Sequence, residues 1–195
     1  MIEKGGFKIF CSLVILFILF LFISLPIAIL MLSFAIFTAY FFRDPERKIG
    51  DGVVSPADGK IDYIAGNRLE IFMSPFDCHV NRAPIDGKVL KVKFQEGRVL
   101  PAFWRIKDPR MNEILIEAED GVFKVIQIAG IFARRIVCYV KEGENLKKGD
   151  RIGIIRFGSR VVLEVPQNYV FVKKMGDKVK AGETVAVKNE NIQRS

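Results

Sequence analysis

The Gly158-Ser159 dipeptide is the part of this sequence with the most distinctive chemistry. Glycine has no Cβ and tolerates strained φ and ψ values, so a neighbouring hydroxyl can approach its carbonyl with little steric opposition. Addition of the Ser159 Oγ to the Gly158 carbonyl would turn the amide into an ester. Elimination across that ester would leave dehydroalanine, which hydrolyses to a pyruvoyl group. Self-cleavage is one interpretation of the dipeptide, and the other is a turn or a close contact between strands.

Self-cleavage needs a base, and His79 is the only histidine of the chain. Imidazole exchanges protons near neutral pH, which makes His79 the candidate for proton transfer. Asp58 could orient the ring, as the aspartate does in a Ser-His-Asp set. Both residues also have a plainer interpretation, because a lone histidine is more often a surface or core residue and Asp58-Gly59 is a common turn sequence.

Short strands must position these side chains. Apolar residues alternate with other residues from Val161 to Val165, which places Ser159 just before a strand, and Asp120-Gly121 is a typical hairpin turn. An approximate repeat relates 148–152 to 175–179, with glycine-aspartate turns between short strands. These turns resemble the hammerhead repeats of biotinyl/lipoyl-like and barrel-sandwich folds. We therefore predict a mainly β fold with a barrel-sandwich or hammerhead-like domain.

The N-terminal segment has a different composition. Residues 9–42 are 34 consecutive positions without a charge. One helix of that length would span about 51 Å, whereas the hydrocarbon core of a bilayer is about 30 Å thick. Pro26 lies near the middle, where it disfavours a continuous helix. We predict a membrane-embedded helical hairpin as an anchor over residues 1–42, followed by a domain over 43–195, and a single kinked helix is the alternative.

Charge and cysteine content bear on partners and location. The net charge of +8 indicates an anionic partner, and the apolar segment favours an anionic lipid surface over nucleic acid, with a solvated basic surface as the plain alternative. Positive residues at both ends of the apolar segment predict a cell-membrane location with the domain on the cytoplasmic side. Cys11, Cys78 and Cys138 are too few and too scattered for a disulfide framework, and a metal site is not expected.

Four stretches in this order carry a family resemblance: Ser-Pro-Ala-Asp-Gly at 55–59, Phe-Met-Ser-Pro at 72–75 followed by Asp-Cys-His-Val-Asn-Arg-Ala-Pro at 77–84, the segment 127–137, and Arg-Phe-Gly-Ser-Arg at 156–160. Together they resemble the short form of the phosphatidylserine decarboxylase proenzymes, from about Phe42 to the C-terminus. The combination is specific, whereas each stretch alone is not.

The resemblance implies cleavage between Gly158 and Ser159 into a β chain, 1–158, and an α chain, 159–195, that remain associated. Ser159 would become a pyruvoyl group, the covalent pyruvate cofactor, with Asp58 and His79 assisting. The pyruvoyl carbonyl would form a Schiff base with the serine amine of phosphatidylserine in the membrane. Loss of CO₂ and protonation, with His79 as the candidate donor, would give phosphatidylethanolamine, a step of phospholipid biosynthesis.

The sequence departs from longer members of the family at two places. Arg82 stands where they carry a second histidine, and Phe-Gly-Ser-Arg replaces their Leu-Gly-Ser-Thr. A division of labour between two histidines therefore does not transfer, and either His79 serves both steps or another group serves one. Arg82, Arg134 and Arg135 are candidates for binding the lipid phosphate or the substrate carboxylate, with surface charge or salt bridges as the alternative.

Three other functions remain open at this point. The first is decarboxylation of a soluble amino acid, which the apolar segment argues against. The second is decarboxylation of an archaeal ether-linked analogue of phosphatidylserine, whose reacting head group is identical. The third is a non-enzymatic, membrane-anchored barrel-sandwich adaptor. The sequence also leaves the oligomeric state open, including a homo-oligomer.

Overall fold

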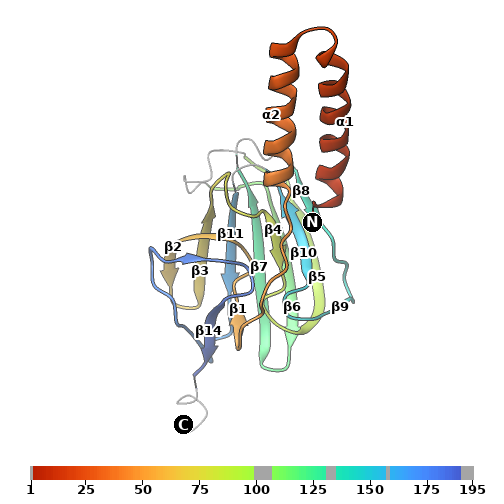
Figure 1. The fold of residues 1–195 in the computed structure, drawn as a ribbon. Coiled ribbons are helices and arrows are strands. Elements are labelled where there is room, and N and C mark those ends of the chain that lie inside the picture. The colour runs from red at the N-terminus through yellow and green to blue at the C-terminus, as the bar shows by residue number, and fades with distance from the viewer. Residues whose placement is uncertain (1, 99–106, 131–134, 157–158, 190–195) are drawn as a thin grey trace. The chain divides into compact units, whose positions relative to one another are not determined.

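A computed structural model of the chain describes residues 2–98, 107–130, 135–156 and 159–189 (Figure 1). The chain divides into two compact units, Met1–Glu46 and Arg47–Ser195. The described part of the first unit is helical, and that of the second consists of strands and turns. The prediction of a mainly β chain with helices at its N-terminus is thereby confirmed.

The apolar segment forms two helices, α1 (Lys4–Leu21) and α2 (Leu25–Phe41). Pro26 lies in the first turn of α2, where its missing N–H removes no helical hydrogen bond, so it starts a helix instead of kinking one. The helical hairpin is therefore confirmed, and the single kinked helix is wrong. Among the described residues, neither helix has the length and apolarity needed to cross a membrane.

The two ends of the hairpin are tied together. Glu3 caps α1, since its carboxylate accepts hydrogen bonds from the backbone N–H groups of Gly5 and Gly6 at 2.8 and 3.2 Å. The backbone N–H of Glu3 also donates to the carbonyl of Phe42 at 2.8 Å. A Cβ on Gly6 would lie 2.1 Å from the Phe42 ring, so only glycine permits this approach.

The described part of the second unit contains the following strands: β1 (Val53–Val54), β2 (Gly59–Ala65), β3 (Arg68–Met73), β4 (Val80–Arg82), β5 (Gly87–Gln95), β6 (Met111–Ala118), β7 (Gly121–Ala129), β8 (Ile136–Cys138), β9 (Asn145–Leu146), β10 (Arg151–Ile155), β11 (Ser159–Glu164), β12 (Tyr169–Phe171), β13 (Lys178–Val179) and β14 (Thr184–Lys188).

These strands form one large curled sheet and two small ones. The large sheet has the order β13-β2-β3-β11-β7-β6-β5-β9, and the small sheets have the orders β4-β10-β8 and β1-β14-β12. β11 lies between β3 and β7, antiparallel to both, as Figure 1 shows. Ser159, the first residue of β11, is opposite Met73 and Ala129. The strand thus begins at Ser159 itself, slightly earlier than the alternation of apolar residues predicted.

A continuous apolar core lies on one face of the large sheet. Central members from three neighbouring strands are fully buried: Leu69, Ile71, Val125, Val161 and Leu163. Burial of this kind of surface stabilises a domain by about 25 cal/mol per Å² removed from water. The core therefore holds β11 in the middle of the sheet, with Ser159 at one end of that strand.

The repeat predicted in the C-terminal part corresponds to two matching turns. Gly149 and Gly176 both have positive φ values, +91° and +100°. In each turn the aspartate that follows the glycine, Asp150 or Asp177, accepts a hydrogen bond from the backbone N–H three residues earlier, at 2.7 and 2.9 Å. The local repeat is confirmed, because the same residues close the same kind of turn.

A β-bulge changes the pattern expected in β5. The alternation of Leu90, Val92 and Phe94 with lysines predicts one buried face, yet Leu90 and Phe94 are exposed and Val89 is buried. The pairing of β5 with β6 shifts register between Val89 and Lys91, so Leu90 turns outward while Val89 and Val92, three residues apart, both face the core.

Candidate functional site

Ser159 is fully buried at the start of the central strand β11. Its hydroxyl donates to the Sδ of Met73 at 3.2 Å. A thioether is a weak acceptor, so this contact restrains the hydroxyl only slightly, and the hydroxyl can turn toward a base or a carbonyl at small cost. Gly158, the other half of the predicted cleavage site, lies outside the described residues.

A chain of three buried side-chain amides ends at the Met73 sulfur, the atom that Ser159 also contacts. Asn112 on β6 donates to the Oε1 of Gln127 on β7 at 2.9 Å, and Gln127 donates to the Oδ1 of Asn81 on β4 at 2.8 Å. The Nδ2 of Asn81 then lies 3.9 Å from the Met73 Sδ. All three amides are almost completely buried. The surroundings of Ser159 are therefore polar on one side and apolar on the other, and closed to bulk water.

His79 is fully buried immediately before β4. Its Nδ1 lies 2.8 Å from the backbone carbonyl of Asp77. Because a carbonyl only accepts, Nδ1 carries the proton of the neutral ring, and Nε2 has the lone pair that a general base needs. The backbone carbonyl of His79 accepts from the N–H of Ile155 at 3.4 Å, which connects it to the strand that leads to the cleavage segment.

Asp58 lies beside Arg47 in an ion pair that is mostly buried. The Nη2 of Arg47 contacts both carboxylate oxygens at 2.8 and 2.7 Å, and the backbone N–H of Ala181 donates to the Oδ1 at 2.8 Å. Burial lowers the pKa of Arg47, but the charge and hydrogen bonds of Asp58 outweigh it and leave the pKa raised. The structure thus shows Asp58 oriented by Arg47, and its predicted role in orienting His79 stays a prediction.

The three predicted substrate-binding arginines have different surroundings. Arg82 is buried, and its Nη1 donates to the backbone carbonyl of Gly149 at 2.9 Å. Arg135 is exposed just before β8. Arg134 lies outside the described residues. Their roles toward a phosphate or carboxylate stay predictions.

All three cysteines are free, as the sequence predicts. Cys78 is buried next to His79, and burial raises the pKa of its thiol, with a smaller upward contribution from the charge of Asp58. A thiol in these surroundings stays protonated at neutral pH and serves as a small core residue.

The position of Ser159 fits a pyruvoyl group better than an ordinary chain end. Plain hydrolysis before Ser159 would leave a charged ammonium at a fully buried position, which costs several kcal/mol or more without a partner. A pyruvoyl end is neutral and has a carbonyl where serine has its amine. The buried start of β11 therefore accepts the group without a desolvated charge.

Most of the residues around Ser159 are not evident from the sequence. Asn81 and Gln127 stand inside the stretches that carry the resemblance. Gln127 is a polar residue in a mostly apolar strand, which is the signal that could have identified it, whereas Asn81 stands between Val80 and Arg82 and has no such signal. Met73 also stands inside such a stretch, but its residue type gives no sign of a contact with Ser159. Its closeness to Ser159 follows only from the pairing of β3 with β11.

The family model described as phosphatidylserine decarboxylase matches residues 34–187 of this chain. A relative from Archaeoglobus fulgidus is 63% identical over 195 residues and covers 100% of both chains; its provisional name is archaetidylserine decarboxylase proenzyme. A relative from Syntrophus aciditrophicus, named phosphatidylserine decarboxylase proenzyme, is 42% identical over 175 residues, covering 81% of this chain and 82% of its own length.

Among solved structures, a glucose permease IIA protein from Mycoplasma capricolum is similar to this chain with a TM-score of 0.41 and 16% identity. The match covers 69% of this chain and 92% of the other.

Proposed function

Because this chain belongs to the phosphatidylserine decarboxylase family, we propose that it cleaves itself between Gly158 and Ser159 and then decarboxylates the serine head group of a phospholipid. The observation that carries the proposal is the complete burial of Ser159 at the first position of the central strand. A serine there is held among fixed groups, as intramolecular attack on the preceding carbonyl requires.

In the processing step, the Ser159 Oγ adds to the Gly158 carbonyl, and His79 accepts the hydroxyl proton at Nε2 through its lone pair. The Asp77 carbonyl holds the ring by its Nδ1–H, so the basic nitrogen keeps one orientation. Asp58 is proposed to assist this proton transfer to His79 through its position and its charge. Arg47 fixes its carboxylate, and the charge of Asp58 acts on the thiol of Cys78, the residue before His79.

In the decarboxylation step, the pyruvoyl group of Ser159 supplies the electrophilic carbonyl that captures the substrate amine and withdraws electrons as CO₂ leaves. The residues of the chain position and protect this chemistry. Met73 and the buried amides enclose the strand end and exclude water, and His79 is the proposed donor of the proton that replaces CO₂. Arg82, Arg134 and Arg135 are the proposed contacts for the phosphate or carboxylate of the substrate.

Two lipids fit the same head-group chemistry. The name of the Syntrophus relative indicates phosphatidylserine for that protein, and the name of the Archaeoglobus relative indicates archaetidylserine for that one. The Archaeoglobus relative matches this chain over its full length and at higher identity than the Syntrophus relative. That match favours the ether-linked lipid as the substrate, with phosphatidylserine as the second candidate.

We also propose that the helical hairpin embeds in the cell membrane and that the catalytic unit lies on the cytoplasmic side. Large apolar side chains stay exposed along both helices and in the turn between them, among them Ile15, Phe22, Ile23, Leu25 and Ile36. Exposed apolar surface of this extent is typical of a membrane or interaction surface. A re-entrant hairpin suits helices of about 27 Å at most, given a rise of about 1.5 Å per residue.

For the β unit, we propose a barrel-sandwich arrangement, supported by the curled sheet and the two matching turns at Gly149 and Gly176. In this proposal the helical unit is the anchor and the β unit is the decarboxylase domain. The α chain would begin at Ser159, inside the large sheet. Residues of β11 pair with β3 and β7 on both sides, so the cut chains would stay associated.

The first test is the intact mass of the purified chain under denaturing conditions. The proposal predicts two chains that break between Gly158 and Ser159, with a pyruvoyl end on the smaller one. Ser159→Ala is expected to remain a single, inactive chain. A folded wild-type protein that stays in one piece would overturn the proposal and favour a non-enzymatic adaptor.

The second test offers the cleaved protein phosphatidylserine and its ether-linked analogue in the same detergent, with free serine as control. Release of CO₂ from both lipids but not from serine would support a lipid decarboxylase, and the ratio of kcat/KM values would identify the preferred backbone. Turnover of free serine at a comparable kcat/KM would contradict the lipid proposal.

A further inference from the structure

Cleavage before Ser159 would create a new chain end inside the large sheet. Chain ends are poorly ordered unless other contacts hold them, because a terminal residue is no longer tethered on one side. The start of β11 would lose its covalent link to β10 at the position where the reactive group must stay in place. Something other than the peptide bond has to hold that strand end.

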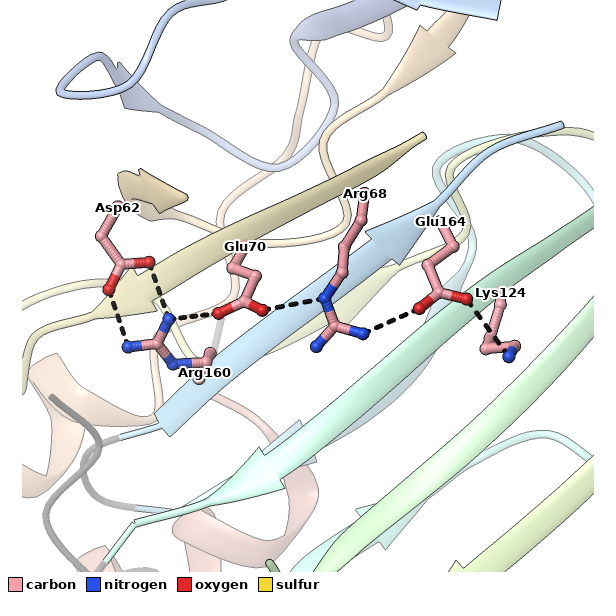
Figure 2. Close-up of polar contacts among 6 residues, drawn as sticks. All are labelled: Asp62, Arg68, Glu70, Lys124, Arg160 and Glu164. Carbon is pink, nitrogen blue, oxygen red and sulfur yellow. Dashed lines mark hydrogen bonds and ion pairs between the residues drawn. The ribbon is translucent and has the colours of Figure 1, made fainter. Parts of the chain in front are cut away.

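Arg160, the next residue, has the contacts for this task. It is 4% exposed, and its guanidinium forms two parallel contacts with Asp62 on β2, from Nη1 to Oδ1 at 2.8 Å and from Nη2 to Oδ2 at 2.7 Å. Its Nη1 also donates to the Oε2 of Glu70 on β3 at 2.6 Å. Figure 2 shows the side chain of Arg160 held between the two carboxylates. Paired contacts of this kind fix orientation as well as position.

The ion pairs continue along the sheet (Figure 2). Glu70 accepts from the Nε of Arg68 at 2.9 Å, and the Nη1 of Arg68 donates to Glu164 at 2.8 Å. Glu164 also lies 3.2 Å from the Nζ of Lys124 on β7. The described ion pairs thus reach β11 at both ends, through Arg160 and Glu164.

Every one of these contacts to β11 would join the α chain to the β chain. Arg160 and Glu164 follow the proposed cleavage site, whereas Asp62, Arg68, Glu70 and Lys124 precede it. Burial raises the pKa of Glu70, but its hydrogen bonds and ion pairs with Arg68 and Arg160 outweigh this and leave the pKa lowered. The carboxylate is therefore charged, and the contacts persist, at neutral pH.

Fixing Arg160 also fixes the register of Ser159. Arg160 is opposite Phe72 and Ile128, and Ser159 is opposite Met73 and Ala129. A shift by one residue would turn Ser159 to the other face of the sheet, because side chains alternate along a strand. It would also take Arg160 away from both carboxylates.

We propose that Arg160 is a positioning residue, which anchors the new end of the α chain through Asp62 and Glu70 and so keeps the group made from Ser159 in register after cleavage. The inference rests on the proposed self-cleavage. It assigns to Arg160 a role that becomes larger when the chain has been cut, which separates it from a residue that stabilises the cut and the uncut chain equally.

The test compares Arg160→Gln in the cleaved protein and in the uncut Ser159→Ala protein. Amide hydrogen exchange of residues 160–164 is measured by mass spectrometry, together with kcat and KM of the cleaved protein. We expect exchange to accelerate at least tenfold in the cleaved protein and less than threefold in the uncut one. The same variant is expected to lower kcat with little change in KM, and Arg160→Lys to recover part of the loss.

Lys124→Gln is the matched control, because it removes an ion pair from the far end of β11. We expect this variant to change the rate of amide hydrogen exchange by the same factor in the cleaved and the uncut protein. Asp62→Asn is a second variant, which weakens the same contact from the side of the β chain. It should likewise accelerate hydrogen exchange more in the cleaved protein than in the uncut one.

Equal acceleration in both backgrounds would overturn the inference and leave Arg160 with a general structural role. The same conclusion would follow if Arg160→Gln and Asp62→Asn both blocked cleavage, because the contact would then act before the cut. An uncut wild-type protein, seen by intact mass before any variant is compared, would instead refute the proposed function itself.

Discussion

At the scale of single residues, the surroundings of Ser159 depend on a chain of side-chain amides, in which each amide forms a hydrogen bond with the next. Gln127 is its middle member, with contacts to both Asn81 and Asn112. A buried amide that loses its partner costs about 1–3 kcal/mol. The position of Gln127 is in turn set by Gly153 on β10, where an added Cβ would lie 2.8 Å from its Nε2 and 2.6 Å from the carbonyl of Val137.

Gly153→Ala should therefore disturb the amide chain without touching a reacting group. We expect a loss of about 1–3 kcal/mol in unfolding free energy, because the new methyl group must displace backbone or an amide. We also expect slower cleavage before Ser159, since the surroundings of the serine would shift. Chemical denaturation and the rate of appearance of the small chain measure the two effects.

The control for this variant is Gly143→Ala, at a turn where no atom lies within 4 Å of the added Cβ, although its positive φ makes it mildly strained. Cleavage of Gly143→Ala should proceed at the wild-type rate. Normal cleavage and stability in Gly153→Ala would show that the amide chain has no influence on Ser159.

At the scale of elements, the outward face of β3 and β11 has ion pairs where the inward face has the apolar core. Glu70 and Arg160 are both almost completely buried on that face. Buried ion pairs contribute little net stability compared with apolar residues, but losing one partner leaves a charge without compensation. The pairs therefore determine which strands lie side by side more than they raise stability.

The lowered pKa of Glu70 predicts how this part of the sheet responds to acid. The folded state holds the pKa below the usual value of about 4.5, so the unfolded chain binds the proton more readily. The contribution of Glu70 to stability is thus complete above about pH 4.5 and is lost as the pH falls through the folded pKa. Glu70→Gln should flatten the dependence of Tm on pH in this range and lower Tm at pH 7.

Thermal unfolding between pH 3 and 7 measures this effect, with the exposed Glu117→Gln as the control. The control should keep the wild-type slope. An unchanged slope in Glu70→Gln would mean that Arg68 and Arg160 do not hold the carboxylate in solution as they do in the structure.

At the scale of the whole molecule, the chain combines an apolar helical unit with a charged β unit. Phe22, Ile23 and Leu25 at the turn of the hairpin are 87, 67 and 60% exposed. Burying one such side chain in an apolar phase is worth about 1.5–3 kcal/mol. The turn of the hairpin is therefore the part of the described chain that gains most from entering a bilayer.

Changing Phe22, Ile23 and Leu25 together to serine should weaken binding of the full chain to lipid vesicles at least tenfold. Flotation with neutral vesicles and with vesicles containing anionic lipid measures the binding, and high salt should reduce only the additional binding to the anionic ones. Phe76→Ser, on an exposed residue of the β unit, is the control and should bind normally. Unchanged flotation of the triple variant would contradict an embedded hairpin.

The sequence alone determined the family and the class of the fold. Gly158-Ser159, His79 and the ordered stretches around them were sufficient to indicate the family, because reactive residue types and their order are written directly in the chain. The helical hairpin followed from a long apolar segment with a proline near its middle. The paired turns at Gly149 and Gly176 followed from a local repeat, and local patterns of this kind need no distant partner.

Only the tertiary structure decided which residues surround Ser159 and Arg160. Met73 lies 86 positions away from Ser159 along the chain, and Asp62 lies 98 positions away from Arg160. Such contacts depend on the order and register of the strands, which a single sequence does not specify. Asp58 shows the same limit, because the acid predicted to face His79 has Arg47 and the Ala181 amide as its contacts. The pairing of β11 with β3 brings Met73 to Ser159, and the pairing of β3 with β2 brings Asp62 within reach of Arg160, since neighbouring strands place opposite residues about 5 Å apart whatever their separation in sequence.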